Sequence, residues 1–239
     1  MDNITEIDII ILSYAQNDDL KLTTMNAVNS LIDSEDPTRI KFNIVVIESQ
    51  NDLKPFQYEH TITLYPNEEF GYHKFMNIGI NSTVANYICI CNNDLIFHKN
   101  WATEILQPFK LYSDIWSASP VCSYLHPKNG FELNTGFRLG YRVRYEVSGW
   151  CIFFRRELLK LIGQLDPNYK FWCADNDYTN TLWTLKLNHL LVTSSIVDHL
   201  ENKTLNNQTA AEQDRLTEGE SIYYNKKWAP KLGEEWTEL

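Results

Sequence analysis

The sequence predicts an α/β protein built on one mostly parallel β-sheet that helices cover on both faces. Two observations lead to this prediction. Short apolar runs without polar alternation, at residues 7–13 and 42–48, are typical of strands buried on both faces. Segments with helical spacing of apolar residues separate such runs, as repeated strand–helix–strand units require. No repeat or linker divides the 239 residues, so we expect a single domain.

The elements follow in chain order. In the first half we expect strands at residues 7–13, 42–48, 61–65 and 87–91, and helices from the Asn17 cap, at 71–83 and at 100–111. Residues 120–145 contain Pro, Gly, Asn and Tyr without periodicity and predict a long functional loop. Beyond it we expect a strand at 147–154, helices at 155–162 and 175–187, a strand at 189–193, and a polar helical tail from residue 209.

The composition excludes several classes of protein. Apolar residues make up 44% and charged residues 22%, which argues against disorder and coiled coil. The longest apolar run, residues 9–12, is far shorter than the roughly 20 residues of a membrane span. The acidic, polar start at residues 1–6 does not resemble a signal peptide. Five cysteines without a Cys-x-x-Cys pair fit buried reduced thiols, so we expect a cytoplasmic protein with no obligate protein partner.

Ligands of such sheets bind beyond the carboxyl ends of the strands. The sequence places polar residues at those points: Ser13-Tyr14, Glu48-Ser49, Pro66-Asn67 and Asn92-Asn93-Asp94. No Gly-x-Gly-x-x-Gly and no phosphate-binding Gly-x-x-x-x-Gly-Lys-Ser/Thr occurs. Dinucleotide oxidoreductases and P-loop nucleotide hydrolases are therefore excluded. A nucleotidyltransferase would need a Gly-rich basic loop after the first strand, which is absent as well.

Four features coincide near the predicted strand ends. Asp94 follows the fourth strand, Asp175 and Asp177 begin a helix, His199 ends a strand, and Gly71 to Gly79 begins a further helix. Each feature alone has a simpler explanation: Asp94 as a turn residue, Asp175 as a helix cap, and His199 as an ordinary solvated histidine.

Together they resemble the GT-A glycosyltransferases, most closely glycosyltransferase family 2, over residues 7–200. The matching segments are 9–14, 45–49, 70–79, Asn92-Asn93-Asp94 at the place of Asp-x-Asp, 148–150, 155–156, 163–166, 175–177, His199 and Lys227-Trp228. The resemblance implies one GT-A domain over residues 1–239. It comprises a nucleotide-sugar part (1–115), an acceptor and catalytic part (116–200) and a tail (201–239).

The resemblance also implies roles for individual residues. Asp175 would be the catalytic base, and Asp94 and His199 would bind a divalent cation, with Mn2+ favoured over Mg2+ because one ligand is an imidazole. The donor would be a nucleotide-diphosphate sugar such as a UDP-sugar, and the transfer of its hexosyl or pentosyl group would be inverting. The residues expected to hold the nucleotide are Ser13, Tyr14, Glu48, Lys74, Asn77, Asn92 and Asn93. Asn92 and Ala174 replace acids that are common in the family.

The acceptor is the open question. The net charge of −10 disfavours nucleic acid, yet residues 138–200 hold 8 basic and 6 acidic side chains. Arginines alternate there with aromatic residues, a pattern that suits a polyanion or a flipped base. The residues expected at the acceptor are Arg138, Arg142, Arg144, Trp150, Trp172 and Asp177.

Several alternatives stay open. The acceptor is a glycan or another hydroxyl compound, or it is a hydroxymethylated base in phage DNA. The arginines could instead pair with the acidic amino-terminal half. A catalytically degenerate module that only binds a nucleotide or sugar is the alternative to an enzyme.

Overall fold

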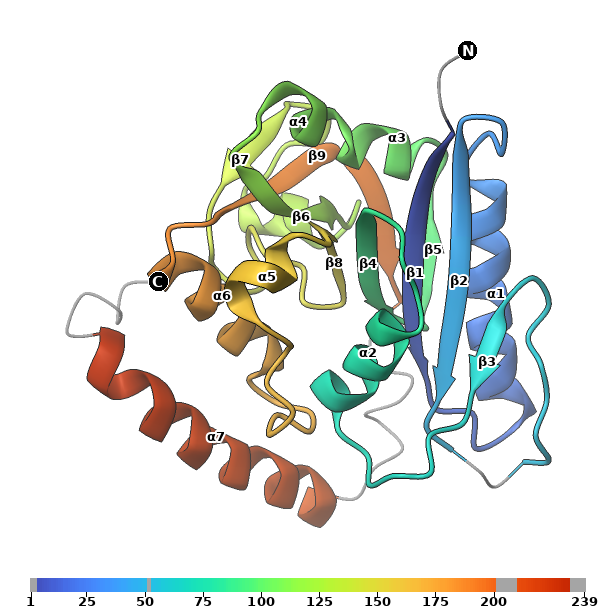
Figure 1. Ribbon diagram of the computed structural model, residues 1–239, viewed down its shortest axis with the longest axis vertical. Coiled ribbons are helices and arrows are strands. Elements are labelled where there is room, and N and C mark those ends of the chain that lie inside the picture. Colours follow the sequence, from blue (N-terminus) through green and yellow to red (C-terminus); the bar gives the residue numbers. More distant parts are fainter. Residues whose placement is uncertain (1–3, 51–52, 201–209, 233–239) are drawn as a thin grey trace.

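In residues 4–50, 53–200 and 210–232, which the computed structural model describes, nine strands form one sheet. The strands are β1 (Thr5–Ser13), β2 (Ile40–Glu48), β3 (Ile62–Leu64), β4 (Tyr87–Asn92), β5 (Leu95–Phe97), β6 (Ile115–Val121), β7 (Phe137–Leu139), β8 (Cys151–Arg155) and β9 (Asn188–His199). Their order is β3-β2-β1-β4-β8-β6-β9-β5, and β7 also pairs with β9 (Figure 1). The predicted α/β class is confirmed.

The first half of the chain supplies the parallel part of the sheet. β3, β2, β1 and β4 all pair in parallel, and Ser13 lies opposite Glu48 while Leu12 lies opposite Asn92. This register brings the carboxyl ends of the strands to one edge, as the sequence predicts. The second half mixes directions, because β8 runs antiparallel to both β4 and β6, whereas β6 and β9 are parallel.

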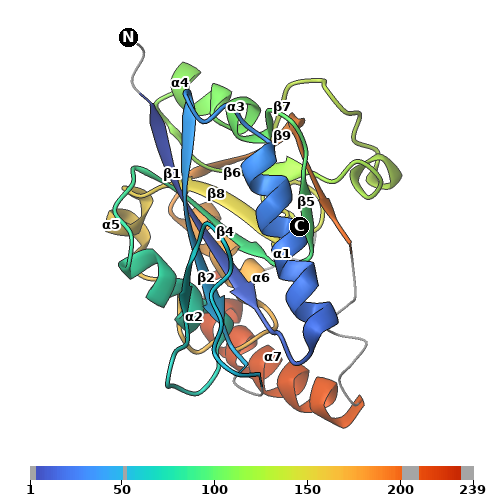
Figure 2. The ribbon, with the colours of Figure 1, turned by 90° about the vertical axis from the view of Figure 1, so that its right-hand side faces the viewer.

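Helices cover both faces of the sheet (Figure 2). They are α1 (Asp18–Asp33), α2 (Tyr72–Asn81), α3 (Trp101–Ile105), α4 (Gln107–Leu111), α5 (Leu158–Ile162), α6 (Ala174–Thr184) and α7 (Ala210–Leu232), with a 3-10 turn η1 (His126–Asn129). The side chain of Asn17 accepts the backbone N–H of Leu20 at 3.0 Å, which confirms the predicted cap. The helix predicted at 100–111 is broken into α3 and α4, because Pro108 has no N–H to continue the hydrogen-bonding pattern.

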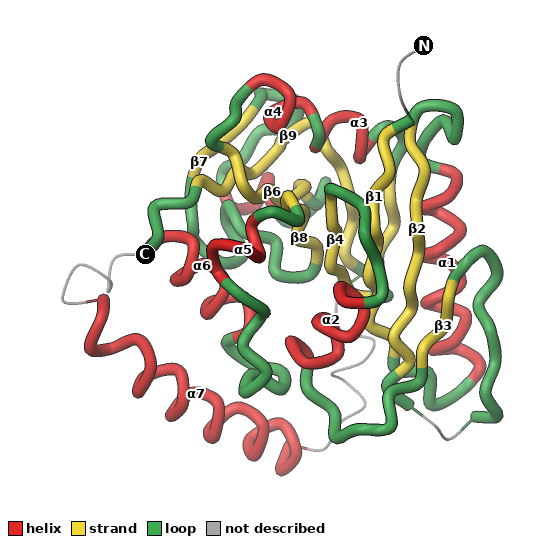
Figure 3. The backbone as a smooth tube through the Cα atoms, in the orientation of Figure 1, coloured by secondary structure: helices red, strands yellow, loops and turns green. Residues whose placement is uncertain are grey.

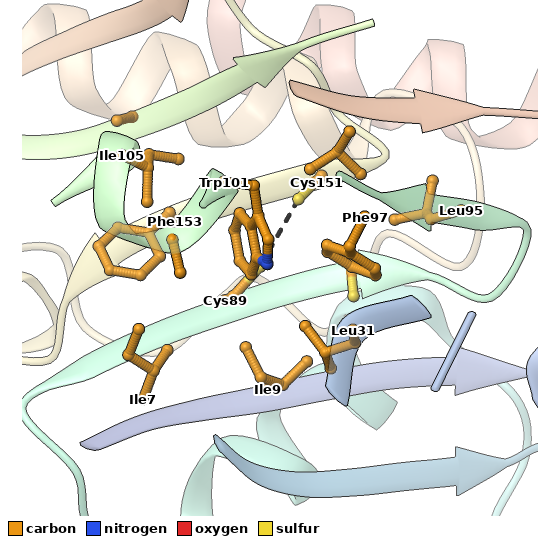
Figure 4. Packing of buried hydrophobic residues seen from close by; sticks show 14 of the residues in the cluster. Ile7, Ile9, Leu31, Cys89, Leu95, Phe97, Trp101, Ile105, Cys151 and Phe153 are labelled. Carbon is orange, nitrogen blue, oxygen red and sulfur yellow. Dashed lines mark hydrogen bonds between the residues drawn. The ribbon is translucent and has the colours of Figure 1, made fainter. Parts of the chain in front are cut away.

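Alternate side chains of β1 point to opposite faces of the sheet, and their packing shows which helices cover each face. Ile7 and Ile9 belong to the core cluster that also contains Trp101 and side chains of α1 and α4 (Figure 4). Ile10 belongs to the opposite cluster, with side chains of α2, α5 and α6. The α2 helix approaches β1 closely at Gly79, where an added Cβ would lie 2.3 Å from Ile10 Cγ2. All five cysteines are free and four are buried, as expected.

Three strands are not foreseen by the sequence. β6 reads as a polar segment, but Ser117 and Ser119 are buried and accept hydrogen bonds from Tyr178 Oη and the Ser148 N–H. β5 and β7 have only three residues each, too few for a periodicity to show. β9 is one continuous strand that joins the segment predicted at 189–193 to the strand end predicted at His199. The segment 120–145, predicted as a loop, contains the end of β6, the turn η1 and the strand β7.

The last helix, α7, lies across one end of the protein, near α6 and α2 (Figures 1 and 3). No helix in the described part of the chain combines the length and apolar character of a membrane span. Residues 1–3 and residue 209, where the tail helix was expected to begin, lie outside the described residues.

Candidate active site

A short antiparallel ladder brings Asp94 and His199 together, although 104 residues separate them. Leu95 of β5 lies opposite His199 of β9, and the N–H of Leu200 donates to the carbonyl of Asp94 at 2.9 Å. As a result His199 Nε2 lies 3.2 Å from Asp94 Oδ1. The two residues that the sequence singles out as metal ligands are thus neighbours.

The surroundings of this pair suit a cation. The side chains of Asp94 and His199 are 8% and 17% exposed, and the ring of Trp150 stacks on the imidazole at 5.4 Å. Two ligands that share one ion at about 2.1 Å and a right angle lie roughly 3 Å apart, so the observed separation fits a common metal. Within the described ranges no cluster of three or more protein ligands occurs, so any metal would need oxygen atoms from a bound molecule or water.

A cavity of about 510 Å³ opens beside the pair. This volume is in the range of small-molecule sites. The wall is formed by Tyr72, Asn92, Leu125, His126, Lys128, Asn129, Arg144, Gly149, Trp150, Phe171, Trp172, Cys173, Ala174, Asp175 and His199. Six of the predicted site residues are among them: Asn92, Arg144, Trp150, Trp172, Asp175 and His199.

Asp175 is fixed in this wall by the start of α6. Cys173 precedes the helix with a left-handed φ of 58°, and Asp175 Oδ1 accepts the N–H of Asn176 at 2.9 Å. Gly149 packs so closely that an added Cβ would lie 2.5 Å from Asp175 Oδ2. Burial raises the pKa of Asp175, against a smaller lowering by its backbone hydrogen bonds and the charge of Arg144. A raised pKa brings a carboxylate closer to the proton affinity that a general base needs.

The ends of β1 and β2 form a buried polar network. Ser13 Oγ donates to Glu48 Oε2 at 2.7 Å, and Glu48 also accepts from Tyr58 Oη and from the N–H of Ala15. Burial raises the pKa of Tyr58 to about 12. Ser13 and Glu48 therefore fix the turn after β1, and a direct side-chain contact with a nucleotide would require these hydrogen bonds to break.

Two other predicted nucleotide contacts are already engaged with protein groups. The amide of Asn77 donates to the carbonyl of Leu165 at 2.7 Å and accepts its N–H at 3.1 Å. Lys74 Nζ pairs with Glu68 Oε2 at 2.6 Å. Neither residue lines the cavity. Asn77 thus links α2 to the segment before α6, so the asparagine of the Asn-x-Gly motif has a structural role in this protein.

The remaining two predicted contacts lie near the site but outside the cavity wall. Asn93 is buried, and its amide donates to Thr24 Oγ1 at 2.8 Å. Tyr14 Oη accepts from the amide of Gln16 at 2.9 Å.

The arginine cluster separates into different environments. Arg144 lines the cavity, whereas Arg142 pairs with Glu146 and lies over the ring of Tyr145. Arg138 is exposed on β7, outside the wall. Arg156 pairs with the buried Asp8 of β1 at 2.7 Å. The alternative that Arg138, Arg142 and Arg144 pair with the acidic amino-terminal half finds no such ion pair among the described residues, since Arg142 pairs with Glu146 instead.

Asp177 points away from the cavity wall and is engaged by α7. It is buried, accepts from Trp228 Nε1 at 2.7 Å, and pairs with Lys227 Nζ at 2.7 Å. The structure therefore does not bring it to the acceptor region proposed from the sequence. Lys227 and Trp228, the Lys-Trp pair named in the resemblance, both contact Asp177 instead.

Several lining residues were not identified from the sequence. His126, Lys128 and Asn129 lie in η1, inside the segment predicted as a functional loop, so only their location was foreseeable. His126 Nδ1 accepts the N–H of Cys122 at 2.8 Å, so it is deprotonated there, and burial lowers the pKa of this histidine. Two atoms of lining residues, Tyr72 Oη and Trp172 Nε1, are buried and have no hydrogen-bond partner among the residues that the structure describes.

No protein-family model matches the sequence, and no curated protein matches it. Solved structures do match the fold. GalNAc-T7, with UDP, GalNAc and Mn2+, matches with a TM-score of 0.66 at 15% identity, covering 83% of this chain and 44% of that one. The mannosyltransferase PcManGT from Pyrobaculum calidifontis, with GDP-Man and Mn2+, matches with a TM-score of 0.62 at 14% identity, covering 84% and 59%. The chain thus spans about half the length of these structures. Its fold is that of the GT-A glycosyltransferases.

Proposed function

We propose that the protein is a metal-dependent, inverting glycosyltransferase that moves a hexosyl or pentosyl group from a nucleotide-diphosphate sugar to an acceptor hydroxyl. One observation supports this most: Asp175 and His199 line the same cavity, and Asp94 lies 3.2 Å from His199. The candidate base and one member of the candidate metal pair thus line the same cavity. Both structural neighbours were solved with Mn2+ and a nucleotide or nucleotide sugar, which agrees with this proposal.

Each group has a defined task in this reaction. Mn2+ held by Asp94 and His199 would neutralise charge on the leaving diphosphate. Asp175 accepts the proton of the acceptor hydroxyl while the oxygen of that hydroxyl bonds to the anomeric carbon. The bond from that carbon to the diphosphate breaks on the opposite side, and the nucleotide diphosphate leaves with the electron pair. One base opposite one leaving group gives inversion.

Donor hydrolysis with Mn2+ over a panel of UDP-, GDP-, TDP- and CMP-sugars tests the proposal. Asp175→Asn should lower transfer by about 10²–10⁴-fold because the base is lost, while nucleotide binding with Mn2+ persists. Asp94→Asn should abolish the Mn2+ dependence, and Asp18→Asn, an exposed change on α1, serves as the control. If turnover survives Asp175→Asn, the mechanism is wrong. If the wild type binds donors without any turnover, the protein is a degenerate binding module.

A hydroxymethylated DNA base is the second candidate acceptor. Arg144 lines the cavity together with the aromatic side chains of Trp150, Phe171 and Trp172, a combination that suits a stacked base and a phosphate. Repeating the assay with hydroxymethylcytosine DNA tests this candidate. An absence of stimulation by any nucleic acid would count against it and leave a glycan or another hydroxyl compound.

A further inference from the structure

Two cations in the cavity wall form no ion pair among the residues that the structure describes. Lys128 of η1 and Arg144 both line the cavity and form no ion pair with a residue that the structure describes. Other basic residues named above do form ion pairs: Arg142 pairs with Glu146, and Lys74 pairs with Glu68. In a protein of net charge −10, two unpaired cations facing one cavity form a local site for an anion.

The backbone holds Arg144 in an uncommon conformation. Its φ of 70° is left-handed, which costs an L-residue of this size about 1 kcal/mol or more. Hydrogen bonds stabilise this conformation: the N–H of Arg144 donates to the carbonyl of Val147, and the amide of Asn129 donates to the carbonyl of Arg144, both at 2.9 Å. The second bond joins η1 to the turn, so the segments that carry Lys128 and Arg144 form one wall.

Arg144 and the candidate base Asp175 line the same cavity, and the charge of Arg144 also lowers the pKa of Asp175. A molecule whose anionic group pairs with Arg144 therefore lies in the cavity that Asp175 also lines. Aromatic side chains of the same wall, Phe171 and Trp172, pack edge to face at 5.7 Å and offer apolar surface to such a molecule. The candidate metal pair consists of Asp94, which lies between β4 and β5, and His199 at the end of β9, whereas Lys128 lies in η1 and Arg144 in the turn before β8.

We propose that the acceptor carries an anionic group, a phosphate or a carboxylate, which pairs with Arg144 and Lys128 while its hydroxyl faces Asp175. That the bound molecule is the acceptor rests on the proposed function. The presence of an anion site does not depend on it. A phosphorylated small molecule and the phosphates of DNA share the chemistry that these cations recognise.

Direct binding of phenyl phosphate, followed by tryptophan fluorescence, tests the site without any assumption about turnover. Arg144→Asn removes the charge but keeps a residue that tolerates left-handed backbone, and Lys128→Gln removes the other charge. Each should raise the Kd for phenyl phosphate about tenfold or more, as loss of a charged hydrogen bond predicts. Arg144→Lys should retain part of the affinity, and Arg138→Asn, outside the cavity, should retain all of it. No binding by the wild type, or equal binding by all variants, would overturn the inference.

Matched acceptor pairs then separate the two sources of phosphate. Glucose is compared with glucose 6-phosphate, and 5-hydroxymethyl-deoxycytidine with its 5′-monophosphate and with an oligonucleotide that carries the same base. The wild type should prefer the phosphorylated member at least tenfold in kcat/KM, and Arg144→Asn should reduce the ratio of the two kcat/KM values toward one. A raised KM for the donor in hydrolysis by Arg144→Asn would assign Arg144 to the donor and refute the inference. Phenyl phosphate binding without donor hydrolysis would instead refute the proposed function.

Discussion

Lys227 Nζ lies 2.7 Å from Asp177 Oδ1 and 2.7 Å from Asp166 Oδ2, and so joins α7 to two segments around the candidate base. Trp228 Nε1 donates to the same Asp177 oxygen at 2.7 Å. Burial would raise the pKa of Asp166, but hydrogen bonds from Lys227, Asn168 and Tyr223 together lower it to about 2. Because Asp177 lies in the first turn of the helix that presents Asp175, α7 supports the position of the base without touching the cavity.

Lys227→Met should therefore destabilise the protein strongly. It leaves the buried carboxylate of Asp177 without its cation, and removing one partner of a buried ion pair costs about 3 kcal/mol. Urea unfolding measures this loss. Lys226→Met is the matched control, because Lys226 is exposed on the same helix and should change the unfolding free energy by less than about 0.5 kcal/mol. Equal effects of the two changes would show that α7 is not fastened through Lys227.

Gly149→Ala should impair catalysis more than stability. The added Cβ would lie 2.5 Å from Asp175 Oδ2 and 2.8 Å from Asp175 Cβ, so the candidate base must move. We expect kcat to fall about tenfold or more, since small displacements of catalytic groups have effects of this order. Gly219→Ala is the control because its added Cβ meets open space. Unchanged kcat in Gly149→Ala would mean that the position of Asp175 is not critical.

Acid should destabilise the fold through His189. Burial lowers its pKa to about 4, although the charge of Glu146 opposes this shift. The Nε2–H of this histidine donates to the carbonyl of Glu146, and its Nδ1 accepts from Ser117 Oγ, which itself accepts from Tyr178 Oη. This chain of hydrogen bonds requires a neutral imidazole.

The sign of the pH effect follows from the two pKa values. The unfolded chain binds the proton near pH 6.5 and the folded chain only near pH 4, so stability is complete above 6.5 and falls as the pH drops toward 4. The loss is on the order of 3 kcal/mol at most. Urea midpoints measured from pH 4 to 8 should show this slope. His189→Gln should reduce it without removing it, because burial also lowers the pKa of His73 and His126, and His60→Asn, at an exposed position, should leave it unchanged. A slope that His189→Gln leaves intact would assign the acid sensitivity elsewhere.

The sequence predicts the parallel half of the fold because its strands are continuous apolar runs. It also selects Asp94, Asp175 and His199 as candidates, of which Asp175 and His199 line one cavity and Asp94 lies beside His199. It does not predict β6, whose buried serines are hydrogen-bonded by partners distant in the chain. The resemblance assigns Asn77 and Lys74 to a nucleotide, yet the distant Leu165 and the nearby Glu68 already engage their polar atoms. Residue type and spacing therefore select candidate residues, while their partners in the folded chain decide which side chains face the cavity.

Tyr72→Phe tests whether the cavity wall holds a group reserved for a ligand. Tyr72 Oη is buried without a hydrogen-bond partner, and burial raises its pKa far above the usual range, so the hydroxyl stays protonated. Removing an unsatisfied buried hydroxyl should leave stability unchanged or raise it by about 1 kcal/mol. If the hydroxyl instead donates to a bound substrate, kcat/KM should fall about tenfold while the melting temperature does not.

The opposite pattern would contradict this assignment. A lower melting temperature with unchanged kcat/KM would mean that Tyr72 Oη has a structural partner in solution. Tyr112→Phe, an exposed tyrosine beyond α4, is the control for the loss of a hydroxyl as such. Because Tyr72 begins the helix that also carries Asn77, while Asp175 begins α6, a loss of kcat/KM in Tyr72→Phe would show that both helices contribute side chains to substrate binding.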